Sequence, residues 1–304
     1  MLRDGVYFGL DDALYRSDPA IGSTDHKLLA QAPEAYWFGS AHNPARPADK
    51  DTPARALGRG VHKCALEGRD AFERTFIRRP EDLERLTEKV RAVLAPRGEA
   101  ILGCDEYDRA LLASTMIRCH PDLSTALSGG APEVSVFWTT EVDGEEVRCK
   151  ARFDYLKPRS VVDLKSIAVL EPQPFEKLCL RAIKKFRYAV QADIYLEARG
   201  ELPRFADEGA VFGEFDSDWF DRVAYAPDYA FTWVFWASSG PPLVWAGYIS
   251  PGSPLLDDPR SIVTQARRNY VRFRQNFGMA TPWIEYQRLA EIVPEDFDAA
   301  FSRD

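Results

Sequence analysis

Two kinds of hydrophobic periodicity divide the chain near residue 130. Upstream, apolar residues recur every three or four positions, as in the segment 54–68, and this spacing predicts helices. Downstream, β-branched and aromatic residues gather in runs that alternate with polar positions, which is typical of strands. These runs predict three strands, at about 134–140, 146–156 and 160–165.

Turn signals arrange these strands. The Asp143–Gly144 pair favours a tight hairpin between the first two, and a short loop joins the third, so we predict a three-stranded antiparallel meander. A long helix at about 173–199, a second hairpin and a helix ending at Gly278 should follow. The order predicts an α/β fold, with a mixed sheet flanked by helices and a mainly helical N-terminal elaboration. We expect one domain, 1–304, in which residues 1–130 are mainly helical and residues 131–304 form the sheet core.

Composition narrows the functional classes. The net charge of −8 argues against coating nucleic acid by bulk electrostatics, although a local basic groove stays open. No apolar run reaches the ~18–20 residues that span a bilayer, and the N-terminus lacks the pattern of a signal peptide, so we expect a cytoplasmic protein without membrane contact. The five cysteines form no C-x-x-C pair, which argues against an iron–sulfur cluster.

The stretch "RFDYLKPRSVVDLKS" places three charged residues in predicted strands. Asp163 and Lys165 are two residues apart and therefore share a face, and Asp154 lies close by at the end of the preceding strand. Two carboxylates at a sheet edge suit Mg²⁺, and a lysine beside them can orient a metal-bound water. A structural ion pair is the alternative, and Asp163 and Lys165 taken alone favour it.

Three further motifs accompany this stretch in the expected order. "GRGVH" contains Gly-x-x-x-His ending at His62, "QADIY" places Gln191 and Tyr195 one helical turn apart, and Glu133 opens the first strand. Together with the Asp and Asp-x-Lys pattern, they resemble the RecB-like branch of the PD-(D/E)xK nuclease superfamily. The segment "IGSTDHKLLAQAPEAYWFG" is similar to the start of the exodeoxyribonuclease VIII (RecE)-like family, a phage-type exonuclease family distantly related to lambda exonuclease.

This resemblance, over about residues 20–200, implies a restriction-endonuclease-like core and a role for each matching residue. His62, Asp154, Asp163 and the backbone carbonyl of Leu164 would bind Mg²⁺, for which Mn²⁺ could substitute. Lys165 would position the attacking water. Catalytic roles would thus fall to Asp154, Asp163 and Lys165, and also to Gln191 and Tyr195, which would hold the scissile phosphate or the nearby strand. Each motif alone has an ordinary structural explanation. Glu133 stands equally well as a hairpin-edge charge or as part of the site, where a place behind the metal ligands is favoured over direct metal binding.

A basic cluster follows the sheet. "RAIKKFRYAVQ" holds the DNA-binding candidates. These candidates are Arg181, Lys184, Lys185, Arg187 and Tyr188. In one continuous helix a stripe leading to the metal site would be formed by Arg181, Lys184, Tyr188, Gln191 and Tyr195. A solvated basic face is the alternative. A second basic run, 267–275, could line the same channel or an oligomer contact.

We therefore expect a Mg²⁺-dependent DNA exonuclease. By resemblance it would be bacterial or phage-encoded, would digest duplex ends 5′ to 3′ in recombination or repair, and would form a homo-oligomeric ring with a single-strand annealing protein as partner. An endonuclease or single-strand nuclease of the same superfamily is one alternative. A non-catalytic DNA-binding recombination partner is the other.

Overall fold

A mixed seven-stranded sheet forms the centre of the computed structural model, which describes residues 1–47, 52–83, 86–286, 289, 291 and 293–294. The strand order is β7-β1-β4-β5-β6-β8-β9, and the β7–β1 and β6–β8 pairs are parallel while the others are antiparallel. The strands are β1 (Gly5–Tyr7), β4 (Ala131–Val142), β5 (Glu145–Lys157), β6 (Ser160–Ala168), β7 (Val211–Phe212), β8 (Ala230–Ser239) and β9 (Val244–Ile249). Strands β2 (Phe76–Arg78) and β3 (Ala100–Leu102) pair in a separate small sheet.

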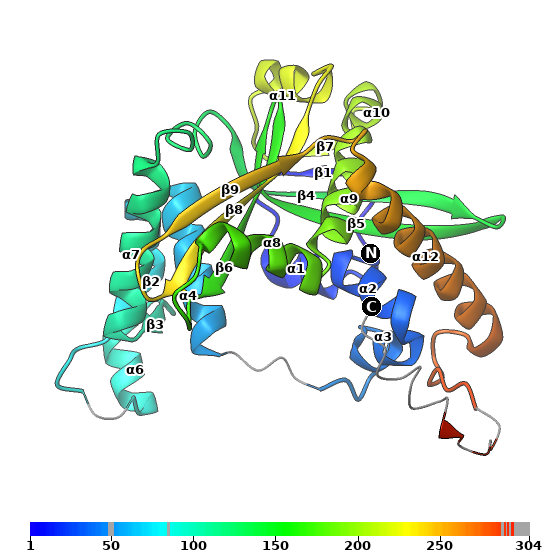
Figure 1. The fold of residues 1–304 in the computed structure, drawn as a ribbon, viewed down its shortest axis with the longest axis horizontal. Helices are drawn as coiled ribbons and strands as arrows, with labels where there is room; N and C mark the ends of the chain where they lie inside the picture. The colour runs from blue at the N-terminus through cyan, green and yellow to red at the C-terminus, as the bar shows by residue number, and fades with distance from the viewer. Residues whose placement is uncertain (48–51, 84–85, 287–288, 290, 292, 295–304) are drawn as a thin grey trace.

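Helices cover both faces of the large sheet (Figure 1). In chain order they are α1 (Asp12–Ser17), α2 (Ser23–Gln31), α3 (Pro33–Gly39), α4 (Pro53–His62), the π-helical turn η1 (Lys63–Glu67), α5 (Arg69–Thr75), α6 (Glu88–Leu94), α7 (Cys104–Cys119), α8 (Phe175–Lys185), α9 (Tyr188–Gly200), α10 (Leu202–Asp207), α11 (Ser217–Ala224), the 3₁₀ turn η2 (Pro254–Leu256) and α12 (Asp257–Phe277). None of the helices in the described residues is long and apolar enough to cross a membrane.

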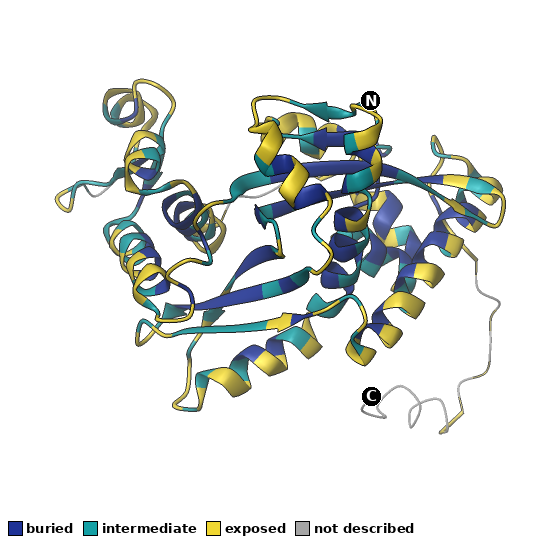
Figure 2. Cartoon of the chain, turned by 90° about the horizontal axis from the view of Figure 1, so that it is seen from above, coloured by how far each residue is buried: buried dark blue, intermediate teal, exposed yellow. Residues whose placement is uncertain are grey.

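Two hydrophobic clusters fill the space between helices and sheet. Strand β8 serves both, because alternate side chains of a strand point to opposite faces: Phe235 joins the cluster under α9 and α12, and Trp236 joins the one under α4 and α7. Both rings are almost fully buried, with exposed fractions of 0% and 1%. Figure 2 shows the central strands buried along most of their length, while the flanking helices expose their outer surfaces. The sheet is therefore the middle layer of three.

The predicted meander and hairpins are present. Strands β4, β5 and β6 pair antiparallel in sequence order, and β8 and β9 form the second hairpin. Asp143 and Gly144 both have positive φ, 53° and 81°, as the type I′ turn between two twisted strands requires. Helix α12 ends before Gly278, as expected.

The long helix predicted at 173–199 is wrong, because two helices occupy this stretch. Helix α8 ends at Lys185 and α9 begins at Tyr188, and between them Arg187 adopts the left-handed conformation with φ 51°. A non-glycine residue in that region interrupts the helical hydrogen bonds and changes the chain direction. No glycine or proline marks the break, so the sequence pattern carries on through it.

The N-terminal region contains strands as well as the predicted helices. Strand β1 pairs antiparallel with β4 in the main sheet, and strands of three residues are too short to display an alternating pattern. A buried ion pair secures this segment: Asp18 lies 2.9 Å from Nη1 of Arg148 on β5. The backbone N–H groups of Leu2 and Ala20 also donate to the Asp18 carboxylate, both at 2.9 Å.

Candidate active site

Strands β5 and β6 share only three residue pairs, and the candidate site begins where their pairing stops. The last pair joins Tyr155 to Val162, after which β6 continues parallel to β8. Asp154 and Asp163 are the next residue on each strand. The carboxylate of Asp154 accepts the backbone N–H of Leu164 at 2.7 Å, which fixes its position between the strands. The two predicted carboxylates therefore lie at one point of the sheet.

Asp163 is held by the two side chains that the sequence motifs associate with it. It is only 1% exposed, and its Oδ2 lies 2.5 Å from Nζ of Lys165, while Nε2 of Gln191 donates to its Oδ1 at 2.7 Å. Burial raises the pKa of Asp163 to about 6, and the Lys165 ammonium opposes that rise. Burial acts to lower the pKa of Lys165, but the nearby carboxylates outweigh it and the pKa is raised. Asp163 and Lys165 are thus a charged pair at neutral pH.

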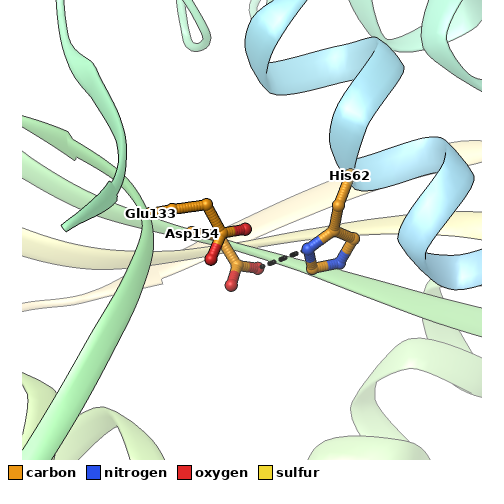
Figure 3. A group of neighbouring side chains, drawn as sticks. All are labelled: His62, Glu133 and Asp154. Carbon is orange, nitrogen blue, oxygen red and sulfur yellow. Dashed lines mark ion pairs between the residues drawn. The ribbon is translucent and has the colours of Figure 1, made fainter. Parts of the chain in front are cut away.

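His62, Glu133 and Asp154 form a second group beside this pair. Each offers one ligand atom, and these atoms all lie within 4.8 Å of one another. Figure 3 shows His62 pointing from α4 toward the two carboxylates, and its Nδ1 lies 3.7 Å from Oδ2 of Asp154. Burial, followed by the charge of Asp154, raises the pKa of Glu133 to about 7. One imidazole and two crowded carboxylates are a donor set that a divalent metal ion fits.

The backbone around His62 and Glu133 departs from regular structure. His62 is the last residue of α4 and is followed at once by the π-helical turn η1, a feature that is frequent at functional sites. Glu133 has φ 52° within strand β4. Such a conformation costs ~1–3 kcal/mol and persists where surrounding structure imposes it, commonly at ligand sites. Both departures lie outside the rules of hydrophobic patterning, so the sequence alone does not reveal them.

The glycines of the "GRGVH" motif differ in their surroundings. A Cβ on Gly60 would lie 3.1 Å from Cδ1 of Leu102 and 3.3 Å from the Phe72 ring, so this glycine permits close packing of α4. A Cβ on Gly58, the motif position, would meet no heavy atom within 4 Å. Close helix packing therefore explains Gly60 and does not explain Gly58.

Gln191 and Tyr195 share one face of α9, as predicted, but their side chains have different environments. The Gln191 amide bonds Asp163, as described above. Tyr195 is 8% exposed and packs against the rings of Phe153 and Phe231, with centroids 5.5 and 5.8 Å away. That either residue holds the scissile phosphate stays a prediction, and so does metal binding by the Leu164 carbonyl.

The DNA-binding candidates do not form the single stripe that a continuous helix would give, since α8 and α9 are separate. Four of them are exposed, namely Arg181, Lys184, Lys185 and Arg187. Tyr188 opens α9 and is partly buried, and the Lys165 ammonium lies 5.0 Å from its ring centroid. Tyr188 thus links the candidate site to the α8–α9 junction, residues 185–188, where exposed basic residues are its neighbours in sequence.

The second basic run, 267–275, is largely committed to structural ion pairs. Arg267 is 8% exposed and lies 2.8 Å from Glu197. Arg274 lies 2.7 Å from Glu145, and Arg272 lies 3.2 Å from Glu285. Paired guanidinium groups offer less to a phosphate backbone than free ones, so this run adds little to a DNA path.

One residue near the site has no role assigned from the sequence, although it lies within the segment "IGSTDHKLLAQAPEAYWFG". Lys27 of α2 directs its ammonium to within 5.3 Å of the Tyr188 ring centroid, and the Lys165 ammonium lies 5.0 Å from the same centroid. Burial and the charge of Lys165 lower the pKa of Lys27 to about 8. A lysine on an amphipathic helix carries no signal that distinguishes it from a solvated one, so sequence reasoning passes over it.

The layered sheet, with an aspartate on one strand and Asp-x-Lys on the next, is the arrangement of the PD-(D/E)xK superfamily. The chain belongs to the family of PDDEXK-like domains of unknown function (DUF3799), whose model matches residues 23–202. The predicted superfamily and fold class are therefore confirmed.

One solved structure agrees with this fold. A candidate exonuclease from Eubacterium rectale is similar to 97% of this chain over 100% of its own, with 15% identity and a TM-score of 0.55. At that identity the likeness concerns the fold alone. SSO0001 aligns with 74% of this chain and 88% of its own at 15% identity, but its TM-score of 0.28 carries no argument. No curated protein matches the chain.

Proposed function

We propose that this chain is a Mg²⁺-dependent DNA exonuclease that hydrolyses phosphodiester bonds from duplex ends. The observation that carries the proposal is the meeting of His62, Glu133 and Asp154 beside the Asp163–Lys165 pair. These residues come from α4, β4, β5 and β6, and a purely structural ion pair would need only the last of these elements. Membership of a PDDEXK-like family adds support, because nucleases of that superfamily use divalent metals.

Each side chain then has a defined task. His62, Asp154 and Asp163 would bind the metal, together with the Leu164 carbonyl, and Glu133 would complete or support that set. A bound Mg²⁺ supplies Lewis acidity toward the phosphodiester and lowers the pKa of a water ligand. Lys165, held 2.5 Å from Asp163, is placed to orient the attacking water and to offset charge that develops on the phosphate.

Gln191 acts in this proposal as a positioning residue. Its amide hydrogen bond to Oδ1 of Asp163 limits rotation of that carboxylate, which would keep the carboxylate in one orientation for metal binding. Tyr195 supports the same face of α9 from within the core. Gln191 and Tyr195 would also hold the scissile phosphate, and the exposed basic residues would contact the DNA backbone.

The finer features of the proposal rest on the resemblance of the motifs to the exodeoxyribonuclease VIII-like family. They are 5′ to 3′ digestion, use in recombination or repair, activity with Mn²⁺, a cytoplasmic location in a bacterial or phage setting, a homo-oligomeric ring, and an annealing-protein partner. The division into one nuclease domain over 1–304 belongs to the same proposal.

A cleavage assay with two DNA topologies tests the function. End-labelled linear duplex and covalently closed circular duplex are incubated with the protein in Mg²⁺ or EDTA. We expect Mg²⁺-dependent loss of the linear DNA alone, and a decrease of ~100- to 1,000-fold for Lys165→Ala, since one group that stabilises developing charge is removed. Lys89→Ala, which removes an exposed lysine of α6, is the matched control.

Each other outcome assigns a different function. Degradation of the closed circle would contradict the exonuclease claim and favour an endonuclease. Retained binding of linear DNA with no cleavage in Mg²⁺ would favour the non-catalytic DNA-binding alternative.

A further inference from the structure

The α8–α9 junction presents an exposed aromatic ring at the edge of the candidate active site. Phe186 is 49% exposed, and its ring lies 5.6 Å from that of Tyr188, which in turn lies 5.0 Å from the Lys165 ammonium. The Tyr188 ring therefore connects the half-exposed Phe186 ring to the Lys165 ammonium. Exposing a phenylalanine is unfavourable in itself, and a half-exposed ring next to a binding site is the usual form of a stacking surface.

The charge around this ring is positive. Lys184, Lys185 and Arg187 flank Phe186 in sequence and are all exposed, and Lys185 Nζ lies 5.4 Å from the Phe186 ring centroid. The chain as a whole has a net charge of −8, so a local run of cations without an acid is a departure from its average. An anion with a flat apolar surface is complementary to this combination, and a nucleotide has both.

Lys27 adds a cation from a different helix. Its Nζ donates to the backbone carbonyl of Phe186 at 3.0 Å and lies 5.3 Å from the centroid of the Tyr188 ring. Among the described residues it has no carboxylate within ion-pair distance. Lys165 is already paired with Asp163, whereas the Lys27 ammonium donates to a backbone carbonyl and can also bind the phosphate of a DNA strand.

We propose that Phe186 and Lys27 form a strand-binding platform for one unpaired nucleotide next to the scissile phosphate. The Phe186 ring stacks on the base, and the Lys27 ammonium binds the phosphate of that nucleotide. Because a base inside a duplex is stacked on both faces and offers none to the Phe186 ring, the platform selects single-stranded or frayed DNA at the point of cleavage. This inference rests on the proposed nuclease function and names the form of substrate which the site takes.

Equilibrium binding in EDTA tests the base contact without metal-dependent hydrolysis. The probe is a single-stranded oligonucleotide that carries 2-aminopurine, whose fluorescence falls when the base stacks. Phe186→Ala should weaken binding about tenfold and remove the quenching, whereas Phe186→Tyr, which keeps a ring, should stay within about twofold of wild type. Leu180→Ala is the matched control, since Leu180 is 50% exposed on α8, and it should bind like wild type.

The salt dependence of the same binding tests the phosphate contact. Lys27→Gln should reduce the slope of log affinity against log salt by about 0.7, the value for one phosphate contact on a single strand, and Lys27→Arg should restore it. Lys89→Gln removes one charge elsewhere and should leave the slope unchanged. Circular dichroism confirms that each variant is folded.

Failure of the platform and failure of the nuclease function give different results. Phe186→Ala binding with wild-type affinity and quenching, or Lys27→Gln with an unchanged salt slope, would overturn the platform even if the protein cleaves DNA. Normal quenching and salt effects in a protein that cleaves no DNA would support the platform and contradict only the nuclease proposal.

Discussion

Glu133 gives the metal-free protein a pH-dependent instability that one substitution should remove. Its pKa is raised from the usual 4.5 to about 7, first by burial and then by the charge of Asp154. The folded chain therefore binds more protons than the unfolded chain between these values, and the free energy of unfolding falls as the pH rises through this window. At ~1.4 kcal/mol for each pKa unit the loss is at most ~3 kcal/mol. Partial exposure of the side chain reduces it to about 1–2 kcal/mol.

Glu133→Gln has no charge to develop in this window. In urea denaturation with EDTA, its free energy of unfolding should gain about 1–2 kcal/mol relative to wild type between pH 5 and pH 8. Glu141→Gln, an exposed position on the same strand, should run parallel to wild type. If Glu133→Gln also runs parallel to wild type over this range, Glu133 does not share a crowded site with Asp154.

Two further predictions concern stability. Gly58→Ala should leave the free energy of unfolding unchanged or raise it by up to ~1 kcal/mol, because alanine favours a helix and no atom lies near the added methyl group. Gly60→Leu should lower the free energy of unfolding by ~1–3 kcal/mol through contact with Leu102. Equal effects of the two substitutions in urea denaturation would contradict this packing. Asp18→Asn should cost ~2 kcal/mol at pH 7 by weakening the Arg148 pair. Burial opposes ionisation of Asp18, but its hydrogen bonds outweigh burial and lower its pKa below 3.8, so the cost should shrink as the pH falls below that value; a cost independent of pH would refute it.

The sheet could be predicted from sequence because its signals are local. Alternation along β4, β5 and β6 and the Asp143–Gly144 turn specify the meander, and Asp163 and Lys165 share a face by the period of a strand. The α8–α9 break could not be predicted, since it depends on one left-handed arginine that no helix-breaking residue announces. The break places Phe186 beside Tyr188, which contacts Lys165 of the candidate site.

The candidate site could also be predicted only in part from the sequence. Motif order placed His62 with Asp154, although 92 positions separate them in the sequence. The position of Glu133 beside them involves a positive φ at that residue, which tertiary contacts impose and the hydrophobic pattern does not predict. Lys27 approaches Lys165 only because α2 packs against α9, so its contact exists solely in the folded chain.

Cleavage of end-labelled linear DNA in Mg²⁺ by Asp154→Asn, beside wild type, tests the central claim most directly. Asparagine is nearly isosteric and can still accept the Leu164 N–H, so the fold should be preserved while a negatively charged metal ligand is lost. The account predicts Mg²⁺-dependent cleavage by wild type and a loss of at least ~100-fold for the folded variant. Cleavage by Asp154→Asn at the wild-type rate would contradict the assignment of this site as the metal-dependent nuclease centre.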